Sequence, residues 1–173
     1  MTPIRTTRND QWSEPVATST FVYVTYIRTT PETLWSALTD AELIKQYWFG
    51  VRCESQWTAG DSWKLLYPDG RTTDTGEIIE AEPPRRLLIR WRHQDKPEFK
   101  AEGESRCTMQ LGSSGPAVKL SITHSIERDP SKFIAAVSNA WPMVISNLKS
   151  LLETGSIVLQ TPYPIESAHA EQE

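Results

Sequence analysis

The feature that most constrains this chain is an apolar stripe at helical spacing between Ser131 and Gly155. Large apolar side chains recur at steps of three and four residues, and polar ones lie on the opposite side of the helix. The apolar set is Phe133, Ile134, Val137, Trp141, Val144, Ile145, Leu148, Leu151 and Leu152, and the polar set is Ser138, Asn139, Asn147, Lys149 and Ser150. Ser131 and Gly155 are typical start and stop residues. Pro142 removes one backbone hydrogen bond, which predicts a kink rather than an end. We therefore expect one long helix that lies on a large partner surface.

The segment before residue 51 predicts one strand and two short helices. Residues 20–28 are almost all β-branched or aromatic, which is typical of a strand. Thr30 is a good N-cap before Pro31, and Asp40 can cap a second helix that Gly50 ends. We expect these two helices to follow the first strand directly.

From Val51 onward, alternating residues and turn signals predict a run of strands. The expected strands lie within residues 51–57, 62–67, 73–82, 86–94, 102–111 and 117–126. Six or seven antiparallel strands with one covered face, together with one long helix, make an α+β fold. The strands must curl around that helix. We divide the chain into an N-terminal arm (1–19), a single domain (20–155) and a C-terminal tail (156–173). The tail either packs on its own domain or reaches a neighbour, so a monomer and a homodimer both remain open.

Composition narrows the class of protein. The 173 residues are enough for a real core without a disulfide or a metal, and we expect no cofactor. The net charge of -4 comes without a block of like charge, which argues against nucleic acid and anionic membranes as partners. Apolar runs are too short to span a membrane, and the N-terminus lacks a signal peptide's apolar region, so we expect a soluble, cytoplasmic protein. Cys53 and Cys107 lack metal-ligand spacing, and we expect two buried, reduced thiols.

Three segments, in this order, carry a resemblance to a known family. They are RTTPETLWSALTDAELIKQYWFG, GEIIEAEPPRRLLIRW and AWPMVISNLKSLLETG. Over residues 20–155 the chain resembles the Hsp90-ATPase-activator-homologue family of the START/Bet v 1-like (SRPBCC) superfamily. The resemblance implies a helix-grip fold, in which a curved antiparallel sheet wraps around a long C-terminal helix and two short helices follow strand 1.

The same superfamily includes lipid carriers, cyclases, hydroxylase domains, co-chaperone domains and stress proteins, so the fold does not fix the function. The eukaryotic co-chaperones of the family carry a second, N-terminal domain that first binds the chaperone. Residues 1–19 are too short to be that domain. The sequence therefore argues against an Hsp90-type chaperone as the partner.

One set of side chains lies on the inner face of the predicted sheet, and another lies on the apolar stripe of the predicted helix. Together they predict one internal pocket. They are Trp63, Leu65, Tyr67, Trp91, His93, Met109, Leu120, Ile122, His124, Trp141, Val144, Ile145 and Leu148. Binding pockets are mostly apolar with few polar groups, so we expect a small apolar or aromatic ligand. His93 and His124 are the polar candidates, either as ligand contacts or as core histidines with satisfied ring nitrogens.

Three functions of different kinds fit these patterns. The first is a small-molecule binding protein with a pocket between the sheet and the helix. The second is an enzyme of cyclase or hydrolase type that uses pocket His and Tyr groups. The third is a chaperone-regulating or other protein-interaction domain without an open cavity. Aromatic inward positions are plentiful, whereas common catalytic motifs are absent and no catalytic residue can be assigned. We therefore rank the binding protein first.

Overall fold

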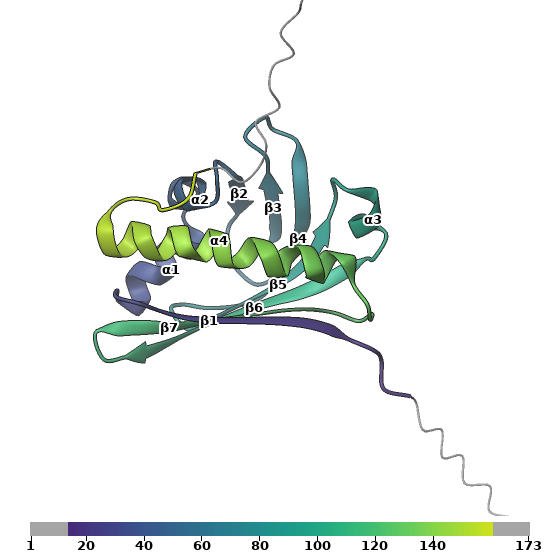
Figure 1. Ribbon diagram of the computed structural model, residues 1–173, viewed down its shortest axis with the longest axis horizontal. Coiled ribbons are helices and arrows are strands. Elements are labelled where there is room, and N and C mark those ends of the chain that lie inside the picture. Colours follow the sequence, from purple (N-terminus) through teal and green to yellow (C-terminus); the bar gives the residue numbers. More distant parts are fainter. Residues whose placement is uncertain (1–13, 161–173) are drawn as a thin grey trace, which may run out of the picture.

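A long helix lies across one face of a seven-stranded antiparallel sheet in the computed structural model, which describes residues 14–160 (Figure 1). The elements, in chain order, are β1 (Ser19–Ile27), α1 (Pro31–Thr39), α2 (Ala41–Tyr47), β2 (Arg52–Ser55), β3 (Ser62–Leu66), β4 (Thr72–Glu82), β5 (Arg86–His93), α3 (Pro97–Lys100), β6 (Glu104–Ser114), β7 (Ala117–Ile126) and α4 (Lys132–Thr154). The predicted α+β helix-grip fold, with two short helices after the first strand, is confirmed.

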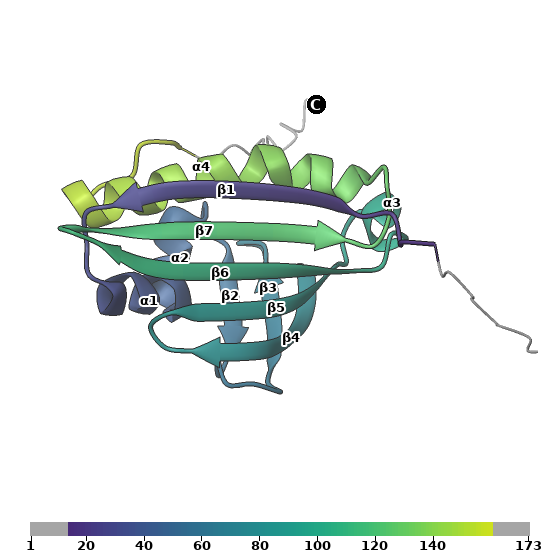
Figure 2. The same ribbon diagram turned by 90° about the horizontal axis from the view of Figure 1, so that it is seen from below.

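The sheet is strongly curved, because the strands at its two edges run in different directions relative to α4. Its strand order is β1-β7-β6-β5-β4-β3-β2, so the first strand pairs with the last. The register shifts between Leu65 and Leu66 on β3 and between Ile78 and Glu80 on β4, and such bulges bend a strand. Figures 1 and 2 show β1, β7 and β6 running along α4, whereas β2 and β3 run across it. The inner face of the sheet therefore wraps part of the way around the helix.

Helix α4 begins and ends where its sequence predicts. The Ser131 hydroxyl accepts a hydrogen bond from the backbone N–H of Ile134 at 3.0 Å, and Gly155 closes the helix with a φ of 82°. Pro142 lies inside the helix without ending it. Much of the predicted apolar stripe is buried, including Trp141 and Leu148. The stripe therefore forms the helix's contact with the core.

Asn147 corrects one part of this interpretation. The period places it on the polar side of α4, but its side chain is 0% exposed. Its Oδ1 atom accepts hydrogen bonds from the backbone N–H groups of Val158 and Leu159 at 3.0 and 2.7 Å. Its Nδ2 atom donates to the Leu159 carbonyl at 3.0 Å. Residues 156–160 thus return along α4 and cover this position, which a period calculated from the helix alone cannot show.

The two short helices after β1 have the predicted caps. Thr30 Oγ1 accepts from the backbone N–H of Thr33 at 3.2 Å, and Asp40 Oδ1 accepts from that of Leu43 at 2.9 Å. The strand patterns did not predict α3, a helix of four residues between β5 and β6. Within residues 14–160, no helix combines the length and apolar character needed to cross a membrane. Residues 1–13 and 161–173, and with them most of the predicted arm and tail, lie outside the described residues.

Both cysteines are buried and free, as predicted. Burial raises the pKa of the Cys53 thiol to about 12, and burial also raises the pKa of Cys107. Both are therefore neutral thiols that pack as small apolar side chains.

Candidate functional site: an aromatic cleft beside α4

Four indole rings from four parts of the chain gather between the sheet and α4. Trp63 on β3 and Trp91 on β5 both lie opposite Gly76 of β4, and their ring centroids are 4.3 Å apart. A Cβ atom at Gly76 would lie 1.8 Å from a backbone oxygen of β5, so only glycine fits there. Trp48, which follows α2, and Trp141 of α4 have ring centroids 5.3 Å apart and complete the cluster. The central glycine therefore lets the sheet bend closely enough for these rings to meet.

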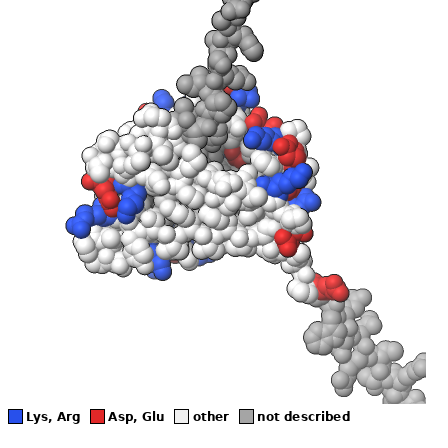
Figure 3. Space-filling model, viewed as in Figure 1, with Lys and Arg blue, Asp and Glu red and all other residues white. Residues whose placement is uncertain are grey.

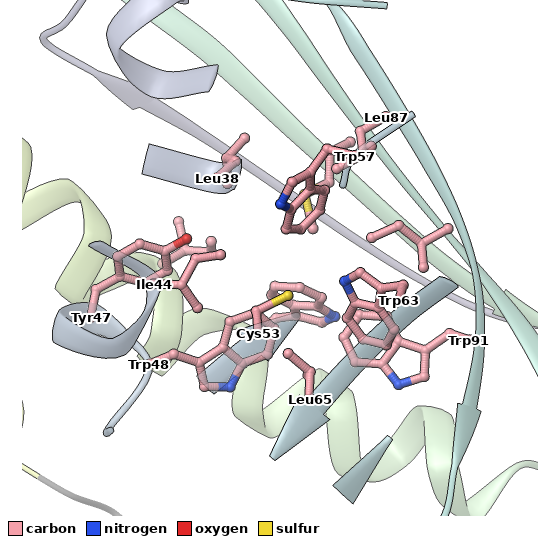
Figure 4. Close-up of a pocket in the computed structure, with 14 residues that line it drawn as sticks. Leu38, Ile44, Tyr47, Trp48, Cys53, Trp57, Trp63, Leu65, Leu87 and Trp91 are labelled. Carbon is pink, nitrogen blue, oxygen red and sulfur yellow. The ribbon is translucent and has the colours of Figure 1, made fainter. Parts of the chain in front are cut away.

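The rings fill most of the space under the middle of α4. The cavity that remains has a volume of about 20 Å³, little more than one water molecule needs. Figure 4 shows the rings of Trp63 and Trp91 side by side at one end of this cavity and Tyr47 at the other. A drug-sized ligand needs roughly 300 Å³ or more, so this cavity is too small for one.

A larger cleft of about 210 Å³ adjoins this cavity and opens to the surface. It lies between the first half of α4, the short helix α3 and the ends of strands β3 to β5. Trp48, Leu65 and Trp91 line both spaces and form the wall between them. The remaining lining residues are Val51, Tyr67, Thr73, Asp74, His93, Lys96, Phe99, Phe133, Ala136, Val137 and Ala140.

The structure divides the thirteen predicted pocket residues among three places. The small cavity is lined by Trp63, Leu65, Trp91, Met109, Trp141 and Ile145. The cleft is lined by Leu65, Tyr67, Trp91 and His93. The other five, which are Leu120, Ile122, His124, Val144 and Leu148, are buried in the core and line neither space. A ligand-binding role for these residues stays a prediction.

The main polar group of the cleft that sequence reasoning missed is Asp74. It is 5% exposed and lies opposite His93, which is 8% exposed, in the β4–β5 register. Its Oδ1 atom accepts from Trp91 Nε1 at 2.8 Å and lies 2.9 Å from His93 Nδ1, and the Thr73 hydroxyl donates to Oδ2. One feature of the sequence could have identified Asp74. It lies two residues before Gly76 in the same strand, so both residues belong to the inner face of the sheet.

This geometry assigns the proton on the His93 ring. An ionised carboxylate only accepts hydrogen bonds, and the Trp91 indole N–H can only donate. Asp74 is therefore an acceptor for its neighbours, and His93 Nδ1 carries a hydrogen directed at it. In the neutral ring, Nε2 is then left with a free lone pair.

That Nε2 atom has no hydrogen-bond partner among the described residues. It exposes less than 1 Å² and is the one buried side-chain nitrogen or oxygen of residues 14–160 without a partner. The His93 ring contacts Phe99 at a centroid distance of 5.4 Å and Phe133 at 5.8 Å, and these two rings are 6.0 Å from each other. Leaving a buried polar atom unpaired costs about 1 to 3 kcal/mol. Such an atom next to a cleft is a candidate ligand contact.

His124, the second predicted histidine, has a different environment. It is 0% exposed, and burial lowers its pKa to about 3, so the ring is neutral. Its Nδ1 atom accepts from Trp141 Nε1 at 3.2 Å. Nε2 therefore carries the proton and donates to Ser105 Oγ at 2.9 Å, and Ser105 donates to the Trp91 carbonyl at 3.1 Å. Both ring nitrogens are satisfied, so His124 is a structural histidine of the core.

Charged groups surround the mouth of the cleft at the α3 end. The Tyr67 hydroxyl donates to Asp95 at 3.1 Å, and Lys96 Nζ lies 5.4 Å from the centre of the Phe99 ring. Figure 3 shows Lys, Arg, Asp and Glu side chains gathered at that end, whereas the face over α4 is largely uncharged. Within residues 14–160, no three His, Cys, Asp or Glu side chains come together as ligands for one metal ion.

Comparison with solved structures gives many proteins of the same fold. The protein MLL2253 from Mesorhizobium loti is 26% identical, with a TM-score of 0.67, and the match covers 78% of this chain and 96% of that one. The Aha1 dimer from Colwellia psychrerythraea is 18% identical over 79% of this chain and 98% of that one, with a TM-score of 0.66. PFC0360w, an HSP90 activator from Plasmodium falciparum, is 23% identical over 77% and 95%, with a TM-score of 0.63.

A search of curated protein sequences finds no significant match. The profile of one protein family, in contrast, matches residues 28–153, from the end of β1 almost to the end of α4. That range includes the two short helices, the indole cluster and the cleft. The chain belongs to the family of Activator of Hsp90 ATPase homolog 1-like proteins, within the SRPBCC superfamily.

Proposed function

We propose that this protein binds a small, mostly apolar aromatic molecule in the cleft between α3, α4 and the ends of β3 to β5. The observation that carries the proposal is the cleft itself, about 210 Å³ in volume with mainly aromatic and aliphatic walls. Ligand sites are concave, mostly apolar and equipped with a few placed polar groups. The volume suits a molecule of one or two rings.

The two other functions that fit the sequence have less support. A protein-interaction domain needs no cleft of this kind, and the likeness to an HSP90 activator at 23% identity concerns the fold alone. An enzyme of cyclase or hydrolase type is favoured by one observation, because Asp74 holds His93 as a carboxylate holds a catalytic base. Conversion of a bound molecule, detected by mass spectrometry after incubation, would support that second candidate.

The direct test measures binding of 2-methoxynaphthalene, an uncharged two-ring probe, by equilibrium dialysis. Two neighbouring alanines of α4 make a matched pair: Ala136 lines the cleft, and Ala135 is exposed and does not line it. Ala136→Phe places a ring in the cleft and is expected to weaken binding by about tenfold or more, equivalent to about 1.4 kcal/mol. Ala135→Phe adds the same ring elsewhere and is expected to bind like the parent. The proposal fails if the parent shows no saturable binding, or if both variants bind equally well.

A further inference from the structure

We infer that the ligand of this cleft carries a weakly acidic hydroxyl, such as a phenol or enol O–H, and donates it to Nε2 of His93. The inference rests on the proposed function and adds the polar end of the ligand to it. It starts from the unpaired state of that nitrogen, which exposes less than 1 Å² although the residue lines the cleft. A ligand that pairs Nε2 removes the penalty of a buried, unsatisfied atom.

The direction of the hydrogen bond follows from the partners of Asp74. Its two carboxylate oxygens already contact three donors, from Trp91, His93 and Thr73. With the Nδ1 hydrogen of His93 directed at Asp74, Nε2 of the neutral ring offers a lone pair. A ketone or ether oxygen would place its own lone pair against that of Nε2, which is repulsive. A hydroxyl group can instead donate a hydrogen bond to Nε2.

The surroundings favour a neutral hydroxyl over a cationic N–H donor. An ammonium group needs an anion or water nearby, because a buried unpaired charge is very unfavourable. Asp74 is the one carboxylate among the lining residues of the cleft, and its oxygens are already engaged. Lys96 adds positive charge at the rim. A phenol or enol O–H is more acidic than an alcohol O–H and is therefore the stronger hydrogen-bond donor to a neutral imidazole.

A ligand can reach Nε2 by displacing the ring of Phe99, the less buried of the two phenylalanine rings in contact with His93. That ring meets His93 edge-on, at an interplanar angle of 70°. It belongs to α3, a helix of four residues of which none is buried. A shift of this surface helix disturbs the core less than a shift of Phe133, which lies in the first turn of α4 and is 4% exposed.

The test compares 2-naphthol with 2-methoxynaphthalene, in which a methyl group blocks the hydroxyl. The ratio of their two dissociation constants is measured by equilibrium dialysis in the parent and in His93→Asn. The asparagine amide N–H can still donate to Asp74, but the variant has no acceptor where Nε2 lies. We expect the preference for 2-naphthol to fall by about tenfold in His93→Asn, the change expected for loss of one hydrogen bond of about 1.4 kcal/mol.

The outcomes separate this inference from the proposed function. If neither probe binds the parent, the cleft is not a ligand site and the proposed function fails. If both probes bind and the ratio is the same in the parent and in His93→Asn, the proposed function stands and this inference is overturned.

Histidine ¹⁵N spectra of the parent protein give a second measurement that needs no variant. We expect a neutral His93 ring protonated at Nδ1, with an Nε2 resonance that moves on addition of 2-naphthol but not of the ether. A ring protonated at Nε2, or a resonance that 2-naphthol leaves unchanged, would equally overturn the inference.

Discussion

The buried, neutral ring of His124 should make the stability of the protein fall as the pH is lowered below about 6.5. In the folded protein, burial lowers the pKa of His124 from 6.5 to about 3, whereas the unfolded chain keeps the ordinary value. Because the folded pKa is the lower one, the stabilising contribution is fully present above pH 6.5 and is lost progressively as the pH falls toward 3. One pH unit within this window is worth about 1.4 kcal/mol. At pH 5 the free energy of unfolding should therefore be about 2 kcal/mol below its value at pH 8.

Urea denaturation at pH 8 and pH 5 measures this difference, and His124→Asn is the control. The asparagine oxygen can accept the hydrogen bond from Trp141, but the side chain does not titrate. The variant has a lower absolute stability because part of the ring's volume is lost, so only the change between the two pH values is compared. His93 is present in both proteins, and its contribution cancels. If the variant loses as much stability between pH 8 and pH 5 as the parent does, the reasoning about His124 is wrong.

Two further predictions concern the sheet and the start of α4. Gly76→Ala should destabilise the protein by about 3 kcal/mol, because the new Cβ would lie 1.8 Å from the Arg90 carbonyl oxygen, whereas Gly112→Ala meets nothing within 4 Å; equal thermal midpoints for the two variants would contradict this. Burial alone raises the pKa of Glu102, but hydrogen bonds from Ser131 and from the first backbone N–H groups of α4 hold it below the ordinary value. Its contribution is present above the unfolded pKa and lost in acid, so Glu102→Gln should lower the free energy of unfolding by about 1 kcal/mol at pH 7 and by much less near pH 3. A urea-measured loss of the same size at both pH values would contradict that assignment.

The fold was predictable because its main signals are local. The spacing of three and four in α4, the caps at Thr30 and Asp40, and the alternation in the strands each depend on residues close in the sequence. The failures involve segments that meet only after folding. Asn147 is buried by residues 156–160, which return along α4, and α3 is a helix of four residues, too short to show a period.

The candidate site was predictable in part for the same reason. Strand parity placed Trp91 and His93 on the inner face, where the structure has them. It did not bring Asp74 to His93, because that pair depends on the register of β4 with β5, and this register shifts between Ile78 and Glu80. A bulge changes the parity of every residue beyond it, and alternation in one strand does not reveal it. The carboxylate that orients the histidine was therefore missed, although both residues belong to recognisable strands.

The side chains of α4 explain why two histidines with the same predicted parity have different roles. Over His124, the helix presents Trp141, whose indole N–H satisfies one ring nitrogen and whose ring fills the space above the sheet. Toward His93, the helix presents Phe133, whose ring contacts the histidine, and beside it the small side chains of Ala136 and Ala140. The small side chains leave a cleft between helix and sheet, and Phe133 has no polar atom with which to pair the His93 ring. The shape of the cleft therefore depends as much on the small side chains of α4 as on the aromatic side chains of the sheet.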